Sequence, residues 1–121
     1  MRNSFVISIG SNVEDADLQV ERAISHLRAV LSDMRWSSVY RTPSVSGDGS
    51  FYSNAVAAGF SSFSSSEMER ICKTYEAECG REKGDGKHVV VDLDVIIANS
   101  EILRPKDAAR SYFTIGFDEI G

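Results

Sequence analysis

Apolar side chains recur with two different spacings along this sequence of 121 residues. Alternating or continuous apolar runs are typical of strands, and four are found: 5–9, 35–41, 51–60 and 88–97. Apolar positions three and four residues apart predict amphipathic helices over 16–32 and 66–79. Ser66 and Glu69 have the spacing of a capping box, and Gly80 stands where glycine commonly ends a helix.

The order of these segments is strand, helix, strand, strand, helix, strand, which is the ferredoxin-like βαββαβ pattern. The predicted fold class is therefore α+β, with an antiparallel sheet that carries two helices on one face and the site on the other. We expect strand 35–41 to pair antiparallel with strand 51–60, and residues 112–115 to add a short last strand. The length fits a single domain over residues 1–121.

Two carboxylates, Asp92 and Asp94, interrupt the most apolar of the predicted strands. Alternation along a strand sends both to one face, about 6–7 Å apart. Because two neighbouring anions repel, we expect positive charge beside them, and Mg²⁺ is suited to a pair of carboxylates completed by water and phosphate oxygens. The alternative is that both lie on an exposed face of an edge strand and have no chemical role.

Tyr52 and Asn54 have the same period-two relation in strand 51–60. An aromatic ring can stack on a flat heterocycle, and an amide can both donate and accept hydrogen bonds along its edge. Together with the carboxylates, they could hold a planar ring beside a polyphosphate. Taken singly, each is equally consistent with an ordinary strand residue.

The composition narrows the classes of partner. A formal net charge of −5 argues against nonspecific binding to nucleic acid or to a membrane surface. Cys72 and Cys79 lie seven residues apart in one predicted helix, roughly 10 Å between their Cα atoms, which is too far for a disulfide. No secretory signal and no apolar run long enough to span a membrane is apparent, so we expect a cytoplasmic protein.

Five short motifs in this order resemble the 6-hydroxymethyl-7,8-dihydropterin pyrophosphokinase family of folate synthesis. They are the strand from Phe5 that ends at Gly10-Ser11-Asn12, Ser38-Val39-Tyr40-Arg41-Thr42-Pro43, Phe51-Tyr52-Ser53-Asn54-Ala55-Val56, Glu76 with Gly80-Arg81, and Asp92-Leu93-Asp94. The resemblance covers roughly the first hundred residues, and the joint occurrence is far more specific than any single motif.

The resemblance implies transfer of a pyrophosphoryl group from ATP to the hydroxymethyl group of a reduced pterin, giving AMP and the pterin diphosphate. It implies that Asp92 and Asp94 bind two Mg²⁺ ions that bridge the ATP phosphates. It assigns the pterin pocket to Thr42, Pro43, Tyr52 and Asn54, with Phe113 or Tyr112 as a second ring-stacking residue. On the nucleotide side it places Glu76, Arg81, Lys87, His88 and Arg110, with Arg81 contacting phosphate.

One segment departs from the family pattern. The family usually has Trp-Gly-Pro-Arg-Thr before its Leu-Asp-Leu-Asp, whereas this chain has Gly86-Lys87-His88-Val89-Val90. The chain also ends earlier than a typical member, so we expect it to lack C-terminal structure. Two alternatives therefore stay open: a catalytically weakened relative that binds pterin or nucleotide only, and a ferredoxin-like interaction or regulatory module. Nothing in the sequence predicts the oligomeric state.

Overall fold

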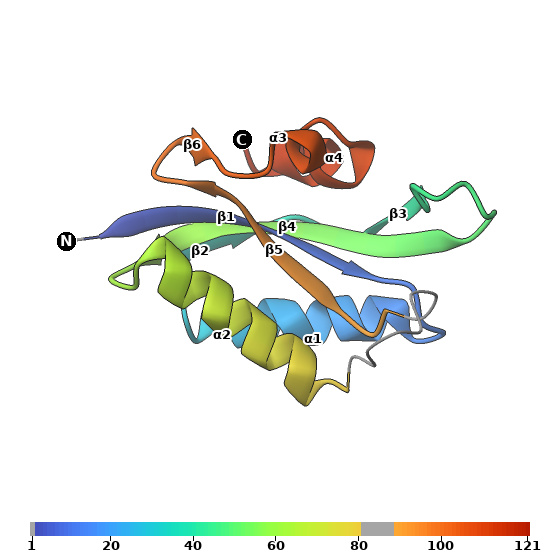
Figure 1. Ribbon diagram of the computed structural model, residues 1–121, viewed down its shortest axis with the longest axis horizontal. Coiled ribbons are helices and arrows are strands. Elements are labelled where there is room, and N and C mark those ends of the chain that lie inside the picture. Colours follow the sequence, from blue (N-terminus) through green and yellow to red (C-terminus); the bar gives the residue numbers. More distant parts are fainter. Residues whose placement is uncertain (1, 81–88) are drawn as a thin grey trace.

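An antiparallel sheet with helices on both faces forms the α+β fold of the computed structural model, which describes residues 2–80 and 89–121 (Figure 1). In chain order the elements are β1 Asn3–Ser11, α1 Ala16–Arg28, β2 Ser32–Trp36, β3 Tyr40–Pro43, β4 Phe51–Ser61, α2 Ser65–Glu78, β5 Asp92–Ala98, β6 Glu101–Ile102, α3 Pro105–Ala108 and α4 Ser111–Ile120.

Of the six strands in the described residues, five lie in the order β2-β4-β1-β5-β6. The sixth, β3, pairs with residues 51–54 of β4, whereas β2 pairs with residues 57–60 of the same strand. All pairs are antiparallel, and β1 lies between β4 and β5. In this register Gly10 of β1 is opposite Asn54 of β4 on one side and Asp92 of β5 on the other. Directly paired residues share a face of the sheet, so the register alone brings these three positions into one row.

The predicted strand 35–41 is divided into β2 and β3, both of which pair antiparallel with β4 as expected. Between them Ser37 is buried, and its hydroxyl accepts a hydrogen bond of 2.9 Å from the Val56 N–H. The Ser37 N–H donates to the Val56 carbonyl, also at 2.9 Å. The interruption therefore leaves the backbone of β4 satisfied while the chain changes direction toward β3.

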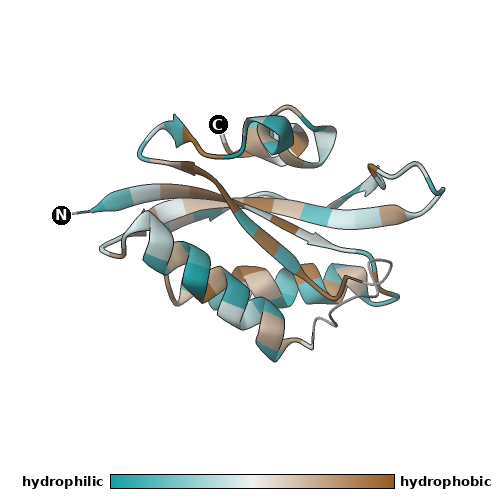
Figure 2. Cartoon of the chain, viewed as in Figure 1, coloured by the Kyte–Doolittle hydropathy of each residue, from teal (hydrophilic) through white to brown (hydrophobic). Residues whose placement is uncertain are grey.

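Helices α1 and α2 pack on one face of the sheet and bury the main apolar core against it (Figures 1 and 2). α1 ends at Arg28, four residues before the predicted end, since Ser32 already begins β2. α2 does begin with a capping box, but the pair is Ser64 and Glu67 rather than Ser66 and Glu69. The serine run of 64–66 followed by two glutamates offers both spacings, and the first is used.

The prediction of a last strand over 112–115 is wrong, because these residues lie in α4. α4 covers part of the face opposite α1 and α2, which we expected to be open (Figure 1). Its apolar residues follow helical spacing, and Phe113 packs with Val56 and Ile96 in a second core. Gly116 allows close approach, since a Cβ there would lie 2.7 Å from both the Tyr40 hydroxyl and Val56 Cγ2.

Two simpler features complete the description. Cys72 and Cys79 are free thiols, as their spacing predicts. Within the part of the chain that the structure describes, no helix combines the length and the apolar character needed to cross a bilayer.

Candidate active site

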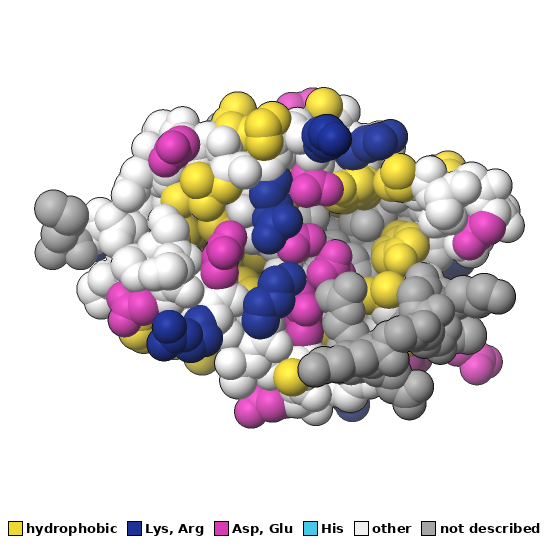
Figure 3. All heavy atoms as spheres, viewed as in Figure 1, with side chains coloured by type: hydrophobic (Ala, Val, Ile, Leu, Met, Phe, Trp, Pro, Cys, Tyr) yellow, Lys and Arg dark blue, Asp and Glu magenta, His cyan; other side chains and the backbone are white. Residues whose placement is uncertain are grey.

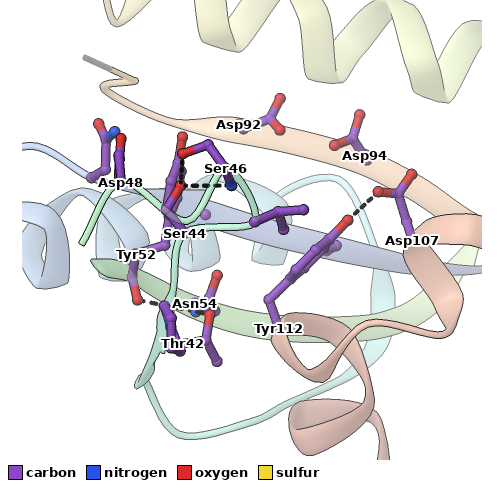
Figure 4. Close-up of a pocket in the computed structure, with 15 residues that line it drawn as sticks. Thr42, Ser44, Ser46, Asp48, Tyr52, Asn54, Asp92, Asp94, Asp107 and Tyr112 are labelled. Atoms are coloured by element: carbon purple, nitrogen blue, oxygen red, sulfur yellow. Dashed lines mark hydrogen bonds between the residues drawn. The ribbon is translucent and has the colours of Figure 1, made fainter. Parts of the chain in front are cut away.

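A cavity of about 310 Å³ opens on the face of the sheet opposite α1 and α2, with the start of α4 beside it (Figure 4). Its lining combines β1, β3 and its following loop, β4, β5 and the α3–α4 segment. The lining residues are Ser8, Gly10, Asn12, Thr42, Pro43, Ser44, Val45, Ser46, Asp48, Tyr52, Asn54, Asp92, Asp94, Asp107 and Tyr112. Strand pairing thus gathers side chains from five separate stretches of sequence.

The β5 wall of the cavity carries Asp92 and Asp94, on the face predicted from their spacing. Their side chains are 35% and 22% exposed, so both reach solvent through the cavity. Burial, and then repulsion from Asp92, raises the pKa of the Asp94 carboxyl to about 6, although Lys73 and Arg104 act in the opposite direction. Burial is therefore the main reason that the ionised form of Asp94 is disfavoured, and the neighbouring Asp92 carboxylate adds to it.

Two side chains of α2 complete the outer edge of β5. The Glu76 carboxylate is 4% exposed and accepts a hydrogen bond of 2.8 Å from the Leu93 N–H. The Lys73 ammonium donates to Glu76 Oε2 at 3.0 Å and to the Leu93 carbonyl at 3.3 Å. Here β6 pairs with Ile97 and Ala98, so within residues 2–80 and 89–121 the two side chains satisfy backbone groups of Leu93 that no neighbouring strand reaches.

Lys73 also connects this edge with the acidic pair. Its Nζ lies 3.4 Å from Asp94 Oδ1 and 3.9 Å from Asp92 Oδ1. Burial alone would lower the pKa of the Lys73 ammonium, but the carboxylates of Asp94, Glu76 and Asp92 outweigh it and raise the pKa. Figure 3, in the view of Figure 1 with α2 below the sheet and α4 above it, shows Lys and Arg side chains beside gathered Asp and Glu side chains in the middle of the molecule.

The opposite wall holds Thr42, Tyr52 and Asn54 (Figure 4). Asn54 is 2% exposed, and its Nδ2 donates to Thr42 Oγ1 at 2.8 Å and to the Tyr52 carbonyl at 3.1 Å. The Tyr52 carbonyl can only accept, so it requires the amide nitrogen on its side, which fixes the amide orientation. The Asn54 Oδ1 is directed toward the space beside Gly10, where an added Cβ would lie 3.6 Å from it.

Tyr112 closes one side of the cavity, and its hydroxyl donates a hydrogen bond to the Asp107 carboxylate (Figure 4). The Tyr40 hydroxyl donates to the Tyr112 carbonyl at 2.6 Å and accepts from the Gly116 N–H at 3.0 Å, which fixes the start of α4 against β3. Phe113, which we expected in the pterin pocket, is 2% exposed and packs in the second core instead. Of these two neighbouring rings, the one that lines the cavity is that of Tyr112.

The structure brings Thr42, Pro43, Tyr52, Asn54, Asp92 and Asp94 together around one cavity. It places two other predicted residues elsewhere. Glu76 is buried behind β5, as described above, and Arg110 is an exposed N-cap residue of α4 outside the cavity lining. Arg81, Lys87 and His88 lie outside the described residues.

A family model for 7,8-dihydro-6-hydroxymethylpterin-pyrophosphokinase matches residues 6–121, nearly the whole chain. The chain belongs to this family. The resemblance expected from five motifs is thereby confirmed, and with it membership of a family of diphosphokinases. No individual curated protein is similar enough to the chain to count as a significant match.

The enzymes of the pterin pyrophosphokinase family generally use ATP and Mg²⁺, and the donor set here fits such an ion. Within residues 2–80 and 89–121, no group of three or more His, Cys, Asp or Glu side chains is arranged to hold a metal. Asp92 and Asp94 are two hard oxygen donors that open onto a cavity, and Mg²⁺ typically takes one or two carboxylates and completes its shell with water and phosphate. A site in which the nucleotide phosphates complete the coordination shell of the metal matches this chemistry.

The site also contains residues that the sequence patterns did not predict. Gly10 forms the floor between the two walls, and its role follows only from strand register. Lys73 lies in α2 and contacts Asp94 of β5, and Asp107 lies in α3 and contacts Tyr112 of α4. Neither contact follows from spacing within one element. The i, i+3 spacing of Lys73 and Glu76 was a visible signal for Lys73.

Proposed function

We propose that this protein transfers the pyrophosphoryl group of ATP to the hydroxymethyl group of 6-hydroxymethyl-7,8-dihydropterin, giving AMP and the pterin diphosphate, in the cytoplasm and as a step of folate synthesis. The observation that carries the proposal is that Asp92 and Asp94 share one cavity with Tyr52 and Asn54, in a chain of the matching family. The hydroxymethyl oxygen forms a bond to the β-phosphorus and its proton is released to solvent, while the bond between the β-phosphorus and the α-β bridging oxygen breaks and AMP leaves with that oxygen.

The wall of Thr42, Tyr52 and Asn54 is suited to the pterin ring. The fixed Asn54 Oδ1 can accept from the ring's N–H and amino groups, which an edge-on heterocycle presents as donors. Tyr52 and Tyr112 line the cavity and supply aromatic surface for the ring faces. In this proposal Tyr112 takes the second ring-stacking role, which the family resemblance left open between Tyr112 and Phe113.

The β5 wall is suited to the triphosphate. Phosphoryl-type transfer asks a protein chiefly for positioning and for neutralisation of charge. Two Mg²⁺ ions held by Asp92 and Asp94 would supply that neutralisation when ATP is bound. Because Gly10 separates Asp92 from Asn54 without a side chain, the reacting hydroxymethyl group can approach the phosphate from the pterin side.

A finer fold assignment supports the same proposal. We propose that β1, α1, β2 with β3, β4, α2 and β5 form a ferredoxin-like core, to which β6, α3 and α4 are added. The strand order β2-β4-β1-β5, with α1 and α2 on one face, is what this pattern requires. The added α4 then forms a side wall of the site rather than a separate unit.

The test is direct detection of products. The protein is incubated with ATP, Mg²⁺ and the reduced hydroxymethylpterin, and AMP and the pterin diphosphate are measured by chromatography and mass spectrometry. We expect both products in equal amounts. The Asp94→Asn variant keeps the size of the side chain but removes its charge, and should lower the rate by about 100-fold or more, as expected for loss of a group that stabilises transition-state charge.

A matched control is Asp118→Asn, on the exposed side of α4 away from the cavity lining, which should leave the rate unchanged. Calorimetry with the reduced pterin and a nonhydrolysable ATP analogue separates binding from turnover. If both ligands bind and no AMP forms, the protein is a binding relative and the proposed reaction is wrong. If neither ligand binds, the proposal fails entirely.

A further inference from the structure

Lys73 lies beside the acidic pair but has no role in the reaction proposed above. It extends from α2 past the edge of β5, where Nζ lies 3.0 Å from Glu76 Oε2, 3.4 Å from Asp94 Oδ1 and 3.9 Å from Asp92 Oδ1. A single ammonium group therefore lies within ion-pair distance of three carboxylates. Two of these are the proposed metal ligands.

The Lys73 ammonium is anchored on the side of the buried Glu76 but open on the side of the acidic pair. Glu76 is 4% exposed and the Leu93 carbonyl accepts from the same nitrogen, whereas the Lys73 side chain is 49% exposed. A lysine is a compact charge on a flexible four-carbon stem. Its nitrogen can therefore withdraw from Asp92 and Asp94 while it keeps its bonds to Glu76 and Leu93.

Arg104 does not duplicate this arrangement. Its Nη2 lies 3.6 Å from Asp94 Oδ1 and 3.9 Å from Glu69 Oε1, so it bridges the acidic pair to another surface carboxylate. Within the described residues, Lys73 is the basic side chain whose ion pairs include both Asp92 and Asp94. A metal ion on these two ligands therefore has to displace the Lys73 charge from both of them.

We propose that Lys73 is an exchangeable internal counter-ion, which occupies the acidic pair in the free protein and yields it to the divalent cations that arrive with the nucleotide. This inference rests on the metal role proposed for Asp92 and Asp94. The Lys73 ammonium and Mg²⁺ are attracted to the same carboxylate oxygens, so each weakens binding of the other. The site therefore binds a divalent ion weakly by itself and more tightly when triphosphate oxygens complete the shell, so that Lys73 makes metal loading depend on substrate.

The experiment measures binding of Mn²⁺ to the full chain without nucleotide or pterin, by titration calorimetry and by loss of the free Mn²⁺ electron paramagnetic resonance signal. Lys73→Gln removes the charge but keeps an amide that can donate to Glu76 and to the Leu93 carbonyl, so β5 stays capped. We expect this variant to bind Mn²⁺ on the order of fivefold more tightly than the native chain, about the contribution of a half-exposed ion pair.

Lys106→Gln is the matched control, because it removes the same charge from an exposed position on α3. It should leave Mn²⁺ affinity unchanged, and Lys73→Arg, which keeps the charge, should stay close to native. Thermal unfolding of each variant shows that it is folded. Equal Mn²⁺ affinity in Lys73→Gln and native protein, or an equal gain in Lys106→Gln, overturns the proposal.

A second comparison separates this inference from the function on which it rests. Asp94→Asn should weaken Mn²⁺ binding in both the native and the Lys73→Gln background. If it does, and Lys73→Gln binds no more tightly than native, only the counter-ion role is wrong. If Asp94→Asn changes nothing in either background, the metal role of the acidic pair is wrong, and the counter-ion role falls with it.

Discussion

At the scale of single residues, Gly10 determines how much room lies between the acidic wall and the amide wall. It is paired with both Asp92 and Asn54 and contributes no side chain to the row they form. A Cβ added there would lie 3.6 Å from Asn54 Oδ1 and from Tyr52 Cδ2, which is ordinary contact. A methyl group would thus fill the floor of the cavity without straining the strand.

We therefore predict that Gly10→Ala folds normally and loses ligand binding. Its free energy of unfolding should change by less than about 1 kcal/mol, since alanine fits the strand. Affinity for the reduced pterin, measured by calorimetry, should fall about tenfold or more, because the methyl occupies the space of the ring.

Gly116→Ala is the contrasting variant. Its Cβ would meet Tyr40 and Val56 at 2.7 Å, so overpacking should destabilise the fold by ~1–3 kcal/mol. Unchanged pterin affinity in Gly10→Ala would show that the ring does not lie between the two walls.

Period-two spacing was enough to predict which residues of one strand share a face. It placed Asp92 on the same face as Asp94, and Tyr52 on the same face as Asn54. It could not show that Gly10 lies between these pairs, because that depends on the register of three strands distant in sequence. Nor could it choose between Tyr112 and Phe113. In a helix, neighbouring residues point about 100° apart, and only the docking of α4 decides which of the two faces the cavity.

At the scale of elements, the contact between α1 and α2 contains a titratable ring. His26 of α1 stacks on Tyr75 of α2, with ring centroids 4.2 Å apart. Its Nε2 is buried, and no described group forms a hydrogen bond with it. Burial lowers the pKa of His26 below its usual 6.5, although the nearby Glu78 carboxylate acts in the opposite direction.

This lowered pKa predicts a pH-dependent loss of stability. Below pH 6.5 the unfolded chain takes up a proton on His26 that the folded chain resists, so the free energy of unfolding should decrease as pH falls from 6.5 toward the folded pKa. His26→Phe keeps a ring to stack on Tyr75 and removes the titration. Denaturant unfolding between pH 7.5 and 5 should show the native chain losing stability relative to this variant. Parallel curves would contradict the assignment.

The pattern of apolar side chains predicted the long strands but not the last helix. Long apolar runs predicted β1, β4 and β5, and these runs are continuous because α1 and α2 bury one face of the sheet and α4 buries part of the other. Residues 112–115 are rich in aromatic and β-branched side chains, which favour strands in isolation. They form a helix because Phe113, Gly116 and Phe117 align at helical spacing against Val56 and Ile96, so tertiary packing outweighs local preference.

At the scale of the whole molecule, charge sets the conditions for nucleotide binding. The chain has a formal net charge of −5, and four carboxylates line the cavity: Asp48, Asp92, Asp94 and Asp107. A nucleoside triphosphate brings several further negative charges to the same space. Among the described residues, Lys73 and Arg104 oppose this repulsion, and both are already paired with Asp94.

We therefore predict that removal of Mg²⁺ by a chelator weakens binding of the nucleotide much more than binding of the pterin. Replacing Mg²⁺ with EDTA should weaken binding of a nonhydrolysable ATP analogue on the order of tenfold or more, since no cation then bridges phosphate and carboxylate. Affinity for the reduced pterin, whose ring is uncharged and whose wall is formed by Thr42, Tyr52 and Asn54, should change little. Calorimetry with each ligand in both buffers measures the difference, and equal nucleotide affinity with and without Mg²⁺ would place the triphosphate away from Asp92 and Asp94.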